Sequence, residues 1–514
     1  MNTVADILQN ARQKNVQLSS QGGRLHYRAP KGALTPEEIE KLRAASVQIV
    51  ALLERPDSTS RGLVHAPLAF AQQAHWNFYQ LGQKPAVRQL ASATRLSGRL
   101  QVKALEKSIE AVTRRHAALR TRIVVRDGIP VQEIHESPDI ELEITDLTAL
   151  SEELRETEII RQIEDLIMQP IAVAAGPLVG IRLVRTASEE HVLIVAMEHT
   201  VSDASSIGVL LSNLFTGYVQ AIQGRPISLP PPTQFMDLAI KQQRALDSWL
   251  ATHGRYWERR MSSSRRLRFP ADADSSMTNA RGWGKISIHI GKEQKAELRQ
   301  WCRLRRTTLV MSVFTAYTAA VLSWCGVSEA IIQYQTDGRV ESRLANTIGF
   351  LASVLYLRME LRDADTFVDL LKRSVEEYCS AHEHADFYYL ETRIPKPEFL
   401  GNPAFNWVPP GFPINVSDLD GSQDALTLAP IAFEHPMLRT LTSDNEPLML
   451  LYESEDAIDG GILFPLNRFS SGNMERFTHH FTMLLRTLLE NPERRVKDLT
   501  ITEDLYRAQR VAEE

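Results

Sequence analysis

The sequence predicts an α+β protein that folds as more than one packed unit. Its 514 residues, 43% of them hydrophobic, exceed what a single core usually serves. From about residue 64 to 500, helical and strand-like stretches alternate without a repeat of fixed period. Residues 260–284 are polar and poor in apolar periodicity, so we expect the chain to cross there from an N-lobe, 65–260, to a C-lobe, 261–514.

The most regular stretches predict the elements of these lobes. Helical spacing of apolar residues predicts helices over 102–115, 151–168, 205–222 and 292–304, and a last helix over 474–489. Continuous apolar runs predict buried strands over 192–197 and 330–335.

The first 56 residues are predicted to form a separate unit of helix, hairpin and helix. Apolar residues recur at helical spacing over 3–14. Two alternating runs around a Gly-Gly turn then predict a β-hairpin. Thr35 is a good N-cap and Pro36 suits the first helical position, so a second helix begins there and runs to Leu53. Turn-forming and polar residues over 57–64 predict a linker.

Two interpretations of this small unit stay open. It shows no nucleophile and base together, and it could simply pack on the main body. Alternatively, the open edge of its hairpin accepts an extended peptide by strand addition. The unit resembles the β-hairpin docking domains of assembly-line proteins, especially over RLHYRAPKGALTPE. The resemblance implies capture of the C-terminal tail of an upstream subunit, an acidic one, by Arg24, Tyr27, Arg28 and Lys31.

Composition argues against several classes of protein. The net charge of −5 lacks the basic surplus of a nucleic-acid binder. The three cysteines show neither zinc-site spacing nor a disulfide framework. No stretch reaches the roughly 18 to 20 apolar residues of a membrane span, and the N-terminus lacks the layout of a signal peptide. We therefore expect a cytoplasmic protein with no nucleic-acid or membrane partner.

The most informative local sequence is HVLIVAMEHTVSDASSIGVLL, residues 191–211. Five successive apolar residues near its start predict a strand buried on both faces. Helical spacing resumes soon afterwards, with Ser202 or Asp203 as N-cap, so His199 lies on the corner between strand and helix. A histidine there can accept a proton from an attacking amine or hydroxyl. An isolated histidine is more often a residue of the core, and the spacing to Asp203 does not decide between the two interpretations.

Several segments resemble, in order, the signature motifs of the condensation domains of non-ribosomal peptide and polyketide assembly lines. MEHTVSDASS resembles the active-site motif His-His-x-x-x-Asp-Gly, with His199 at the second histidine and Asp203 at the aspartate. The other matching segments are PLAFAQQAHWNF (67–78), RRHAALRTRI (114–123), TQFMDLAIKQQ (233–243), NTIGFLASVLYLR (346–358) and HADFYYLE (384–391).

The resemblance implies two chloramphenicol-acetyltransferase-like lobes in a V shape, with a tunnel between them. A polyketide or peptidyl chain enters as a thioester on the phosphopantetheine arm of a carrier protein, and an alcohol or amine acceptor enters opposite. His199 is then the general base or the residue that positions the nucleophile, with Glu198 and Ser202 in support. Asp203 is expected to pair with Arg339 of the segment TDGR. The chain itself is expected to bind neither cofactor nor metal.

Four residues depart from the pattern of the family. Glu198 replaces the first histidine, Ala204 the glycine, Ala74 an arginine of the first motif and Ser353 an asparagine of the fifth. Three hypotheses therefore remain: an active condensing enzyme, a scaffold that binds carriers without catalysis, and a related acyltransferase that uses coenzyme A thioesters. The third is disfavoured because a docking unit has no purpose when the donor diffuses freely.

Among active members, the chain most resembles free-standing enzymes that release a polyketide chain as an ester, as in enacyloxin-type assembly. We therefore expect an ester product over an amide, although the residues do not decide between the two nucleophiles. Two further pairs of histidines are assigned no role. His382 and His384 lack a nearby third metal ligand. His479 and His480 are predicted to lie on a solvated helix face.

Overall fold

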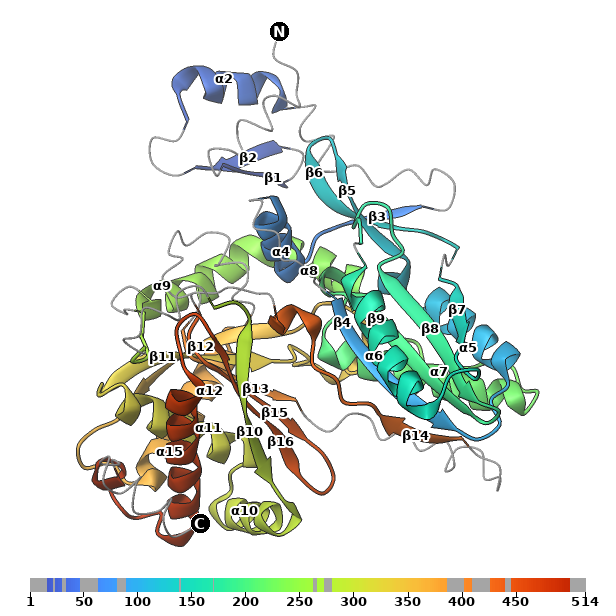
Figure 1. The fold of residues 1–514 in the computed structure, drawn as a ribbon. Coiled ribbons are helices and arrows are strands. Elements are labelled where there is room, and N and C mark those ends of the chain that lie inside the picture. Colours follow the sequence, from blue (N-terminus) through green and yellow to red (C-terminus); the bar gives the residue numbers. More distant parts are fainter. Residues whose placement is uncertain are drawn as a thin grey trace.

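Figure 1 shows the fold of a computed structural model of the protein: two lobes side by side, with a small N-terminal unit at one end. Strands and helices mix in both lobes, which confirms the predicted α+β class. The structure describes residues 16–21, 24–29, 34–46, 63–80, 89–137, 140–169, 171–261, 266–271, 280–385, 402–408, 426–439 and 445–499.

The N-terminal unit contains the predicted hairpin. β1 (Gln17–Gln21) and β2 (Arg24–Arg28) pair antiparallel. Within the described residues the sheet has no third strand, so one edge of each strand is unpaired. Tyr27 on β2 is 41% exposed. The predicted first helix, the Gly-Gly turn and Lys31 lie outside the described residues.

The second helix of this unit begins as predicted. α2 (Pro36–Ala44) has Thr35 as its N-cap. The Thr35 hydroxyl accepts a hydrogen bond from the backbone N–H of Glu38, and the Glu38 carboxylate accepts one from the N–H of Thr35. This reciprocal capping box satisfies two donors that a helix start otherwise leaves without partners. The continuation of the helix towards Leu53 lies outside the described residues.

The first lobe is built on a five-stranded sheet. In spatial order its strands are β14 (Thr427–Pro430), β4 (Gln89–Ser97), β9 (Glu190–Glu198), β8 (Val179–Ala187) and β7 (Leu142–Asp146). The central strand β9 is buried on both faces, as predicted. Its alternate residues contact α5 (Val102–Arg115) and α7 (Ala204–Ile222) on one face and α6 (Glu152–Met168) on the other.

A smaller sheet and the helix α4 complete the described part of this lobe, and further helices lead to the second lobe. The sheet contains β3 (Val64–Pro67), β6 (Ile129–Ile134) and β5 (Thr121–Arg126). α4 (Phe70–Gln80) follows β3 directly. α8 (Phe235–Trp249), a π-helical turn (Leu250–Gly254) and α9 (Arg255–Met261) run from the first lobe to the second. Phe235 is buried in the core of the first lobe, whereas Trp257 is buried in that of the second.

The second lobe has a six-stranded sheet. Its order is β10 (Trp283–Ile290), β16 (Ile458–Pro465), β15 (Leu448–Glu453), β13 (Ala404–Val408), β11 (Glu329–Thr336) and β12 (Ser353–Glu360). The described helices of this lobe include α10 (Lys292–Arg305), α11 (Leu309–Trp324), α12 (Phe367–His382) and α15 (Ser471–Glu490). α11 is almost entirely buried and packs against α12 and α15.

No single helix in the described part of the chain is both long and apolar enough to cross a membrane. α10 and α11 meet that criterion of length and composition only when they are taken together. The chain bends by 98° at the break between these two helices.

Two segments that follow residue 260 belong to the first lobe. β14 lies in the stretch predicted for the C-lobe, yet it pairs with β4 at the edge of the first-lobe sheet. The segment from Leu344 to Leu351 likewise joins the core of the first lobe. These exchanges connect residues distant in sequence, which local periodicity does not report.

Two buried histidines bear on stability. His480 was expected on a solvated face, but its side chain is buried and its Nε2 lies 2.7 Å from the Ser323 hydroxyl. His116 follows α5 and is also buried, with its Nε2 3.0 Å from the amide nitrogen of Asn213. Burial, with the nearby Arg115 charge, lowers the pKa of His116 to about 4.

Acidification is therefore expected to destabilise the folded protein. The unfolded chain takes up a proton on His116 near its ordinary pKa of 6.5, whereas the folded chain does so only near 4. Stability is thus full above pH 6.5 and falls as the pH decreases towards 4. We expect a loss on the order of 2 kcal/mol from His116 at pH 5, measured by urea denaturation.

The variant His116→Gln should show a shallower dependence of unfolding free energy on pH than the wild type. Some dependence remains, because burial also lowers the pKa of His480 to about 4. A variant with the full wild-type slope would contradict the assignment.

Candidate active site

The site is built on the corner between β9 and α7. β9 ends at Glu198, a 3-10 turn covers His199–Val201, and α7 begins at Ala204. Asp203, one of the two predicted caps, is the N-cap: its Oδ1 accepts a hydrogen bond of 2.8 Å from the backbone N–H of Ser206. Ala204 has helical backbone, so the glycine of the family pattern is not needed there.

The ring of His199 is oriented by the backbone. Its Nδ1 lies 2.8 Å from the carbonyl oxygen of Ser202. A carbonyl can only accept, so we assign a proton to Nδ1, and in the neutral imidazole the lone pair is then on Nε2. Ser202 is buried and its hydroxyl donates to the carbonyl of Glu198 at 2.9 Å. The turn thus holds His199 in the tautomer that a general base requires at Nε2.

Two rings pack against His199. Phe350 precedes β12, and its centroid lies 4.4 Å from that of the His199 ring. His75 comes from α4 and meets His199 edge to face, with centroids 5.2 Å apart and an interplanar angle of 70°. The rings of His75 and Phe350 also contact each other, with centroids 4.6 Å apart. His199, His75 and Phe350, which come from three distant segments, therefore form a small aromatic cluster in which each ring contacts the other two.

α4 is fixed to the turn that carries His199. The buried side chain of Gln72 donates from Nε2 to the carbonyl of Thr200 at 2.9 Å. Its Oε1 accepts from the backbone N–H of Ala69 at 2.9 Å. His75 is one helical turn further on, which carries its ring to the site. Sequence reasoning missed His75: its motif was recognised, but one sequence does not reveal which face of the helix points to His199.

A buried ion pair joins α7 to the connection between β11 and β12. Arg339 donates from Nη1 to Asp203 Oδ2 at 2.9 Å and from Nη2 to Asp203 Oδ1 at 3.0 Å. The two side chains are only 6% and 2% exposed. Asp203 Oδ2 also accepts from the backbone N–H groups of Leu351 and Ala352, both at 3.0 Å. The pair that the sequence predicted is therefore present, with extra partners from the segment that carries Phe350.

The turn that carries Arg339 depends on a glycine. Gly338 has a φ of +66°, in the left-handed region that residues with a side chain rarely adopt. A side chain at Gly338 would also collide with the carbonyl of Leu351. The segment TDGR thus holds its arginine against Asp203 through a backbone conformation that other residues reach only with strain.

The remaining predicted residues lie close to this arrangement or outside it. Glu198 is buried at the end of β9, and its backbone N–H donates to the carbonyl of Leu178. Arg24 and Arg28 lie at the two ends of β2 in the N-terminal unit. Among the described residues, no group of three or more His, Cys, Asp or Glu side chains is arranged to hold a metal ion.

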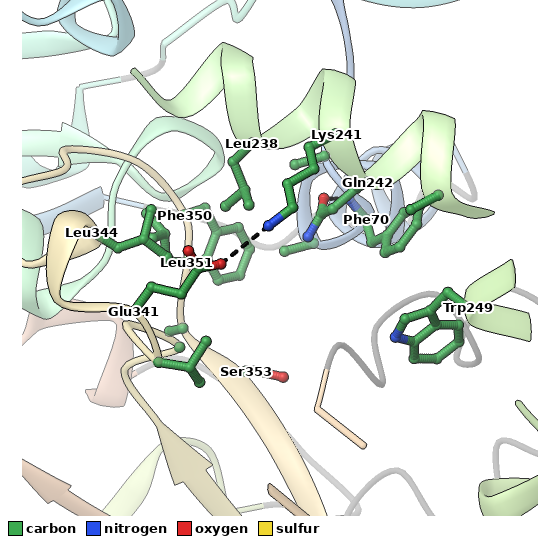
Figure 2. A pocket seen from close by; sticks show the side chains of 16 residues that line it. Phe70, Leu238, Lys241, Gln242, Trp249, Glu341, Leu344, Phe350, Leu351 and Ser353 are labelled. Carbon is green, nitrogen blue, oxygen red and sulfur yellow. Dashed lines mark hydrogen bonds and ion pairs between the residues drawn. The ribbon is translucent and has the colours of Figure 1, made fainter. Parts of the chain in front are cut away.

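A pocket adjoins the aromatic cluster. Figure 2 shows it between α8 and the segment from Gly338 to Ser353. Its volume is about 190 Å³. Phe350 lines it and also contacts His199. At its rim Lys241 donates to Glu341 at 3.1 Å. The other lining residues are Ala69, Phe70, Ala71, Leu238, Gln242, Ala245, Trp249, Val340, Leu344, Leu351 and Ala352.

Comparison with known proteins identifies the class of protein to which this fold and site belong. Residues 63–509 match the family model of the condensation domain, and residues 4–55 match that of the TubC N-terminal docking domain. The chain therefore belongs to the condensation domain family and carries an N-terminal docking domain. The chain is thereby assigned to a family of acyltransferases that form amide or ester bonds.

Individual relatives agree with this assignment. Chondramide synthase of Chondromyces crocatus is 26% identical over 457 residues, which are 87% of this chain but only 12% of that much longer protein. The first condensation domain of the calcium-dependent antibiotic synthetase has the same fold, with a TM-score of 0.70 and 16% identity over 85% of this chain and 100% of that one. The EpoB cyclization-docking bidomain of Sorangium cellulosum is similar with a TM-score of 0.66 and 18% sequence identity. The match covers 95% of this chain and 98% of that one.

Proposed function

We propose that this chain transfers a polyketide or peptidyl chain from a carrier-protein phosphopantetheine thioester to a hydroxyl acceptor, and so releases the chain as an ester. The observation that carries the proposal is the geometry of His199, whose Nδ1 is held by the Ser202 carbonyl while Nε2 carries the lone pair. The segments beside it, α4 and the Phe350 segment, are those of the family's first and fifth motifs.

The proposed chemistry needs a single proton relay. Nε2 of His199 accepts the hydroxyl proton as the acceptor oxygen attacks the thioester carbonyl carbon. When the tetrahedral intermediate collapses, the C–S bond breaks and the imidazolium returns the proton to the phosphopantetheine sulfur. Atoms and charges balance without a further reactant. The protein's main contribution is to hold the two reactants together in this geometry.

The neighbours of His199 have supporting roles in this proposal. Phe350 presents its ring to the imidazole, and an aromatic face stabilises the cation formed when Nε2 takes the proton. His75 packs edge to face against the same ring and restricts its rotation. Glu198 and Ser202 support the corner, and the ion pair of Asp203 with Arg339 holds the Phe350 segment against α7. In this interpretation Asp203 is structural.

The N-terminal unit is proposed to capture the acidic C-terminal tail of an upstream carrier protein. As far as the structure describes this unit, the β1–β2 sheet has an unpaired edge, and such an edge offers backbone groups to an extended peptide. Tyr27 is exposed on β2, and Arg24, Arg28 and Lys31 add positive charge to the same stretch of sequence. We also propose a cytoplasmic location, in keeping with three cysteines that form no disulfide among the described residues.

The experiment that tests the proposal is an intact-mass assay of an acyl-loaded carrier protein that bears its own C-terminal tail. The carrier is mixed with equimolar 2-phenylethanol and 2-phenylethylamine, and the released product is identified by its mass. We expect enzyme-dependent unloading and the ester as the main product. An amide as the main enzymatic product overturns the choice of nucleophile. Equally fast turnover of a coenzyme A thioester overturns the carrier-bound donor.

The same assay separates docking from catalysis. A chain that begins at residue 57 lacks the N-terminal unit. It should unload the carrier slowly at low carrier concentration and at the full rate at high concentration, because a tethered encounter mainly raises the effective concentration. If the truncated chain is equally fast at low concentration, the unit does not recruit the carrier.

A further inference from the structure

The pocket beside the aromatic cluster contains an unpartnered hydroxyl. Ser353, the first residue of β12, is 3% exposed, and its Oγ has no hydrogen-bond partner among the described residues. In Figure 2 this oxygen lies on the side of Ser353 that faces Trp249, and both residues line the pocket. Buried hydroxyl groups are nearly always hydrogen-bonded, so one left without a partner in a pocket marks the place of a ligand group.

The size of the pocket limits the group that it can hold. Ser353, which lines it, has a shorter side chain than the asparagine of the family pattern. The volume of about 190 Å³ compares with roughly 150 Å³ for a cavity that holds benzene. The pocket therefore suits a compact group of about seven non-hydrogen atoms. Its walls are mainly apolar, with Phe70, Leu238 and Trp249 among them.

The location of the pocket favours one of the two substrates. Phe350 forms part of its wall and lies against His199, so a group bound there is next to the reacting centre. The acyl chain is delivered on a carrier, which already holds it at the site. A soluble acceptor has no such tether, so its affinity and orientation depend on contacts with the pocket.

We infer that this pocket binds the non-reacting part of the acceptor, an apolar frame of ring size that bears one polar group, and that the Ser353 hydroxyl hydrogen-bonds to that group. This inference rests on the proposed function, since it takes the acceptor to be a soluble alcohol. Ser353 is then a residue that determines which acceptor is used, and it takes no part in the chemistry.

Phenol and toluene provide a matched pair of probes, because they have the same size and differ only in a hydroxyl and a methyl group. Their binding to the full-length protein is measured by ligand-observed NMR titration. The wild type should bind phenol about three- to tenfold more tightly than toluene, the worth of one hydrogen bond. In Ser353→Ala this preference should disappear while the affinity for toluene stays the same. Ser353→Asn should weaken both, because its side chain fills the space.

A serine outside the pocket serves as the control. Ser248 is exposed on α8, so Ser248→Ala should bind both probes like the wild type. A preference for phenol that persists in Ser353→Ala shows that this hydroxyl is not the partner and overturns the inference. The inference is also overturned if the wild type binds neither phenol nor toluene, or if it binds both with equal affinity.

A competition assay shows which substrate uses the pocket. Phenol should raise the KM for 2-phenylethanol and leave the KM for the acyl carrier unchanged. If it raises only the KM for the carrier, the pocket belongs to the acyl chain and the assignment to the acceptor is wrong. The binding results do not depend on turnover, so a failure of the proposed reaction is distinguishable from a failure of this inference.

Discussion

Replacement of His199 by alanine is expected to slow unloading of the acyl carrier by about 10²- to 10⁴-fold, the usual contribution of a positioned general base. The expectation follows from the hydrogen bond between Nδ1 and the Ser202 carbonyl, which leaves the lone pair on Nε2. Removal of the ring eliminates this base, whereas α7 retains its cap at Asp203. The rate is measured by intact mass at saturating carrier and acceptor.

The control is a histidine outside the site. His289 on β10 is exposed and pairs with Asp459 at the surface, so His289→Ala should retain the wild-type rate. Both variants should unfold at the wild-type denaturant concentration. If His199→Ala unloads the carrier as fast as the wild type, the protein is not using this residue as a base. The interpretation as a carrier-binding scaffold then gains support.

Substitution of Asp203 by alanine is expected to destabilise the protein by about 3 to 5 kcal/mol, because it leaves the buried Arg339 guanidinium without its counter-charge. The carboxylate also accepts from the backbone of Leu351 and Ala352 and caps α7 through Ser206. All of these donors would lose their acceptor inside the protein. Urea denaturation followed by circular dichroism measures the change.

Two comparisons show whether the loss arises from the buried pair. Arg339→Met removes the charge from the other side, and the double variant should be less destabilised than the sum of the two single ones. Glu110→Ala breaks the pair with Arg114 on the surface of α5, where both side chains are more than half exposed, and should change stability by less than about 1 kcal/mol. A similarly small loss in Asp203→Ala would contradict the structural role.

The sequence predicted those parts of the fold that local patterns encode. The apolar run before Met197 identified the buried strand β9, and helical spacing identified α5 with the bounds that the structure shows. The cap and the proline at the start of α2 were also visible, because capping depends on neighbouring residues. The resemblance to the condensation motifs then supplied the pairing of Asp203 with Arg339, which lie 136 positions apart.

What the sequence did not predict depends on contacts between distant segments. His75 contacts His199, and a hydrogen bond from Gln72 to the carbonyl of Thr200 holds α4 against the turn that carries His199. Ser353 was noted as a departure from the family pattern, but its unpartnered hydroxyl became visible only with the pocket around it. His480 was expected at the surface, and its burial against Ser323 on α11 reflects the packing of two helices of the second lobe.

The strand β14 also bears on how the protein is made. β4 is bordered on one side by β9 and on the other by β14, and β14 is translated more than 300 residues later. As the chain leaves the ribosome, the first sheet is therefore formed with the outer edge of β4 uncovered until residue 430 emerges. Uncovered strand edges pair readily with other chains. A nascent chain stalled between the two lobes should consequently depend more on chaperones than one that has completed β14.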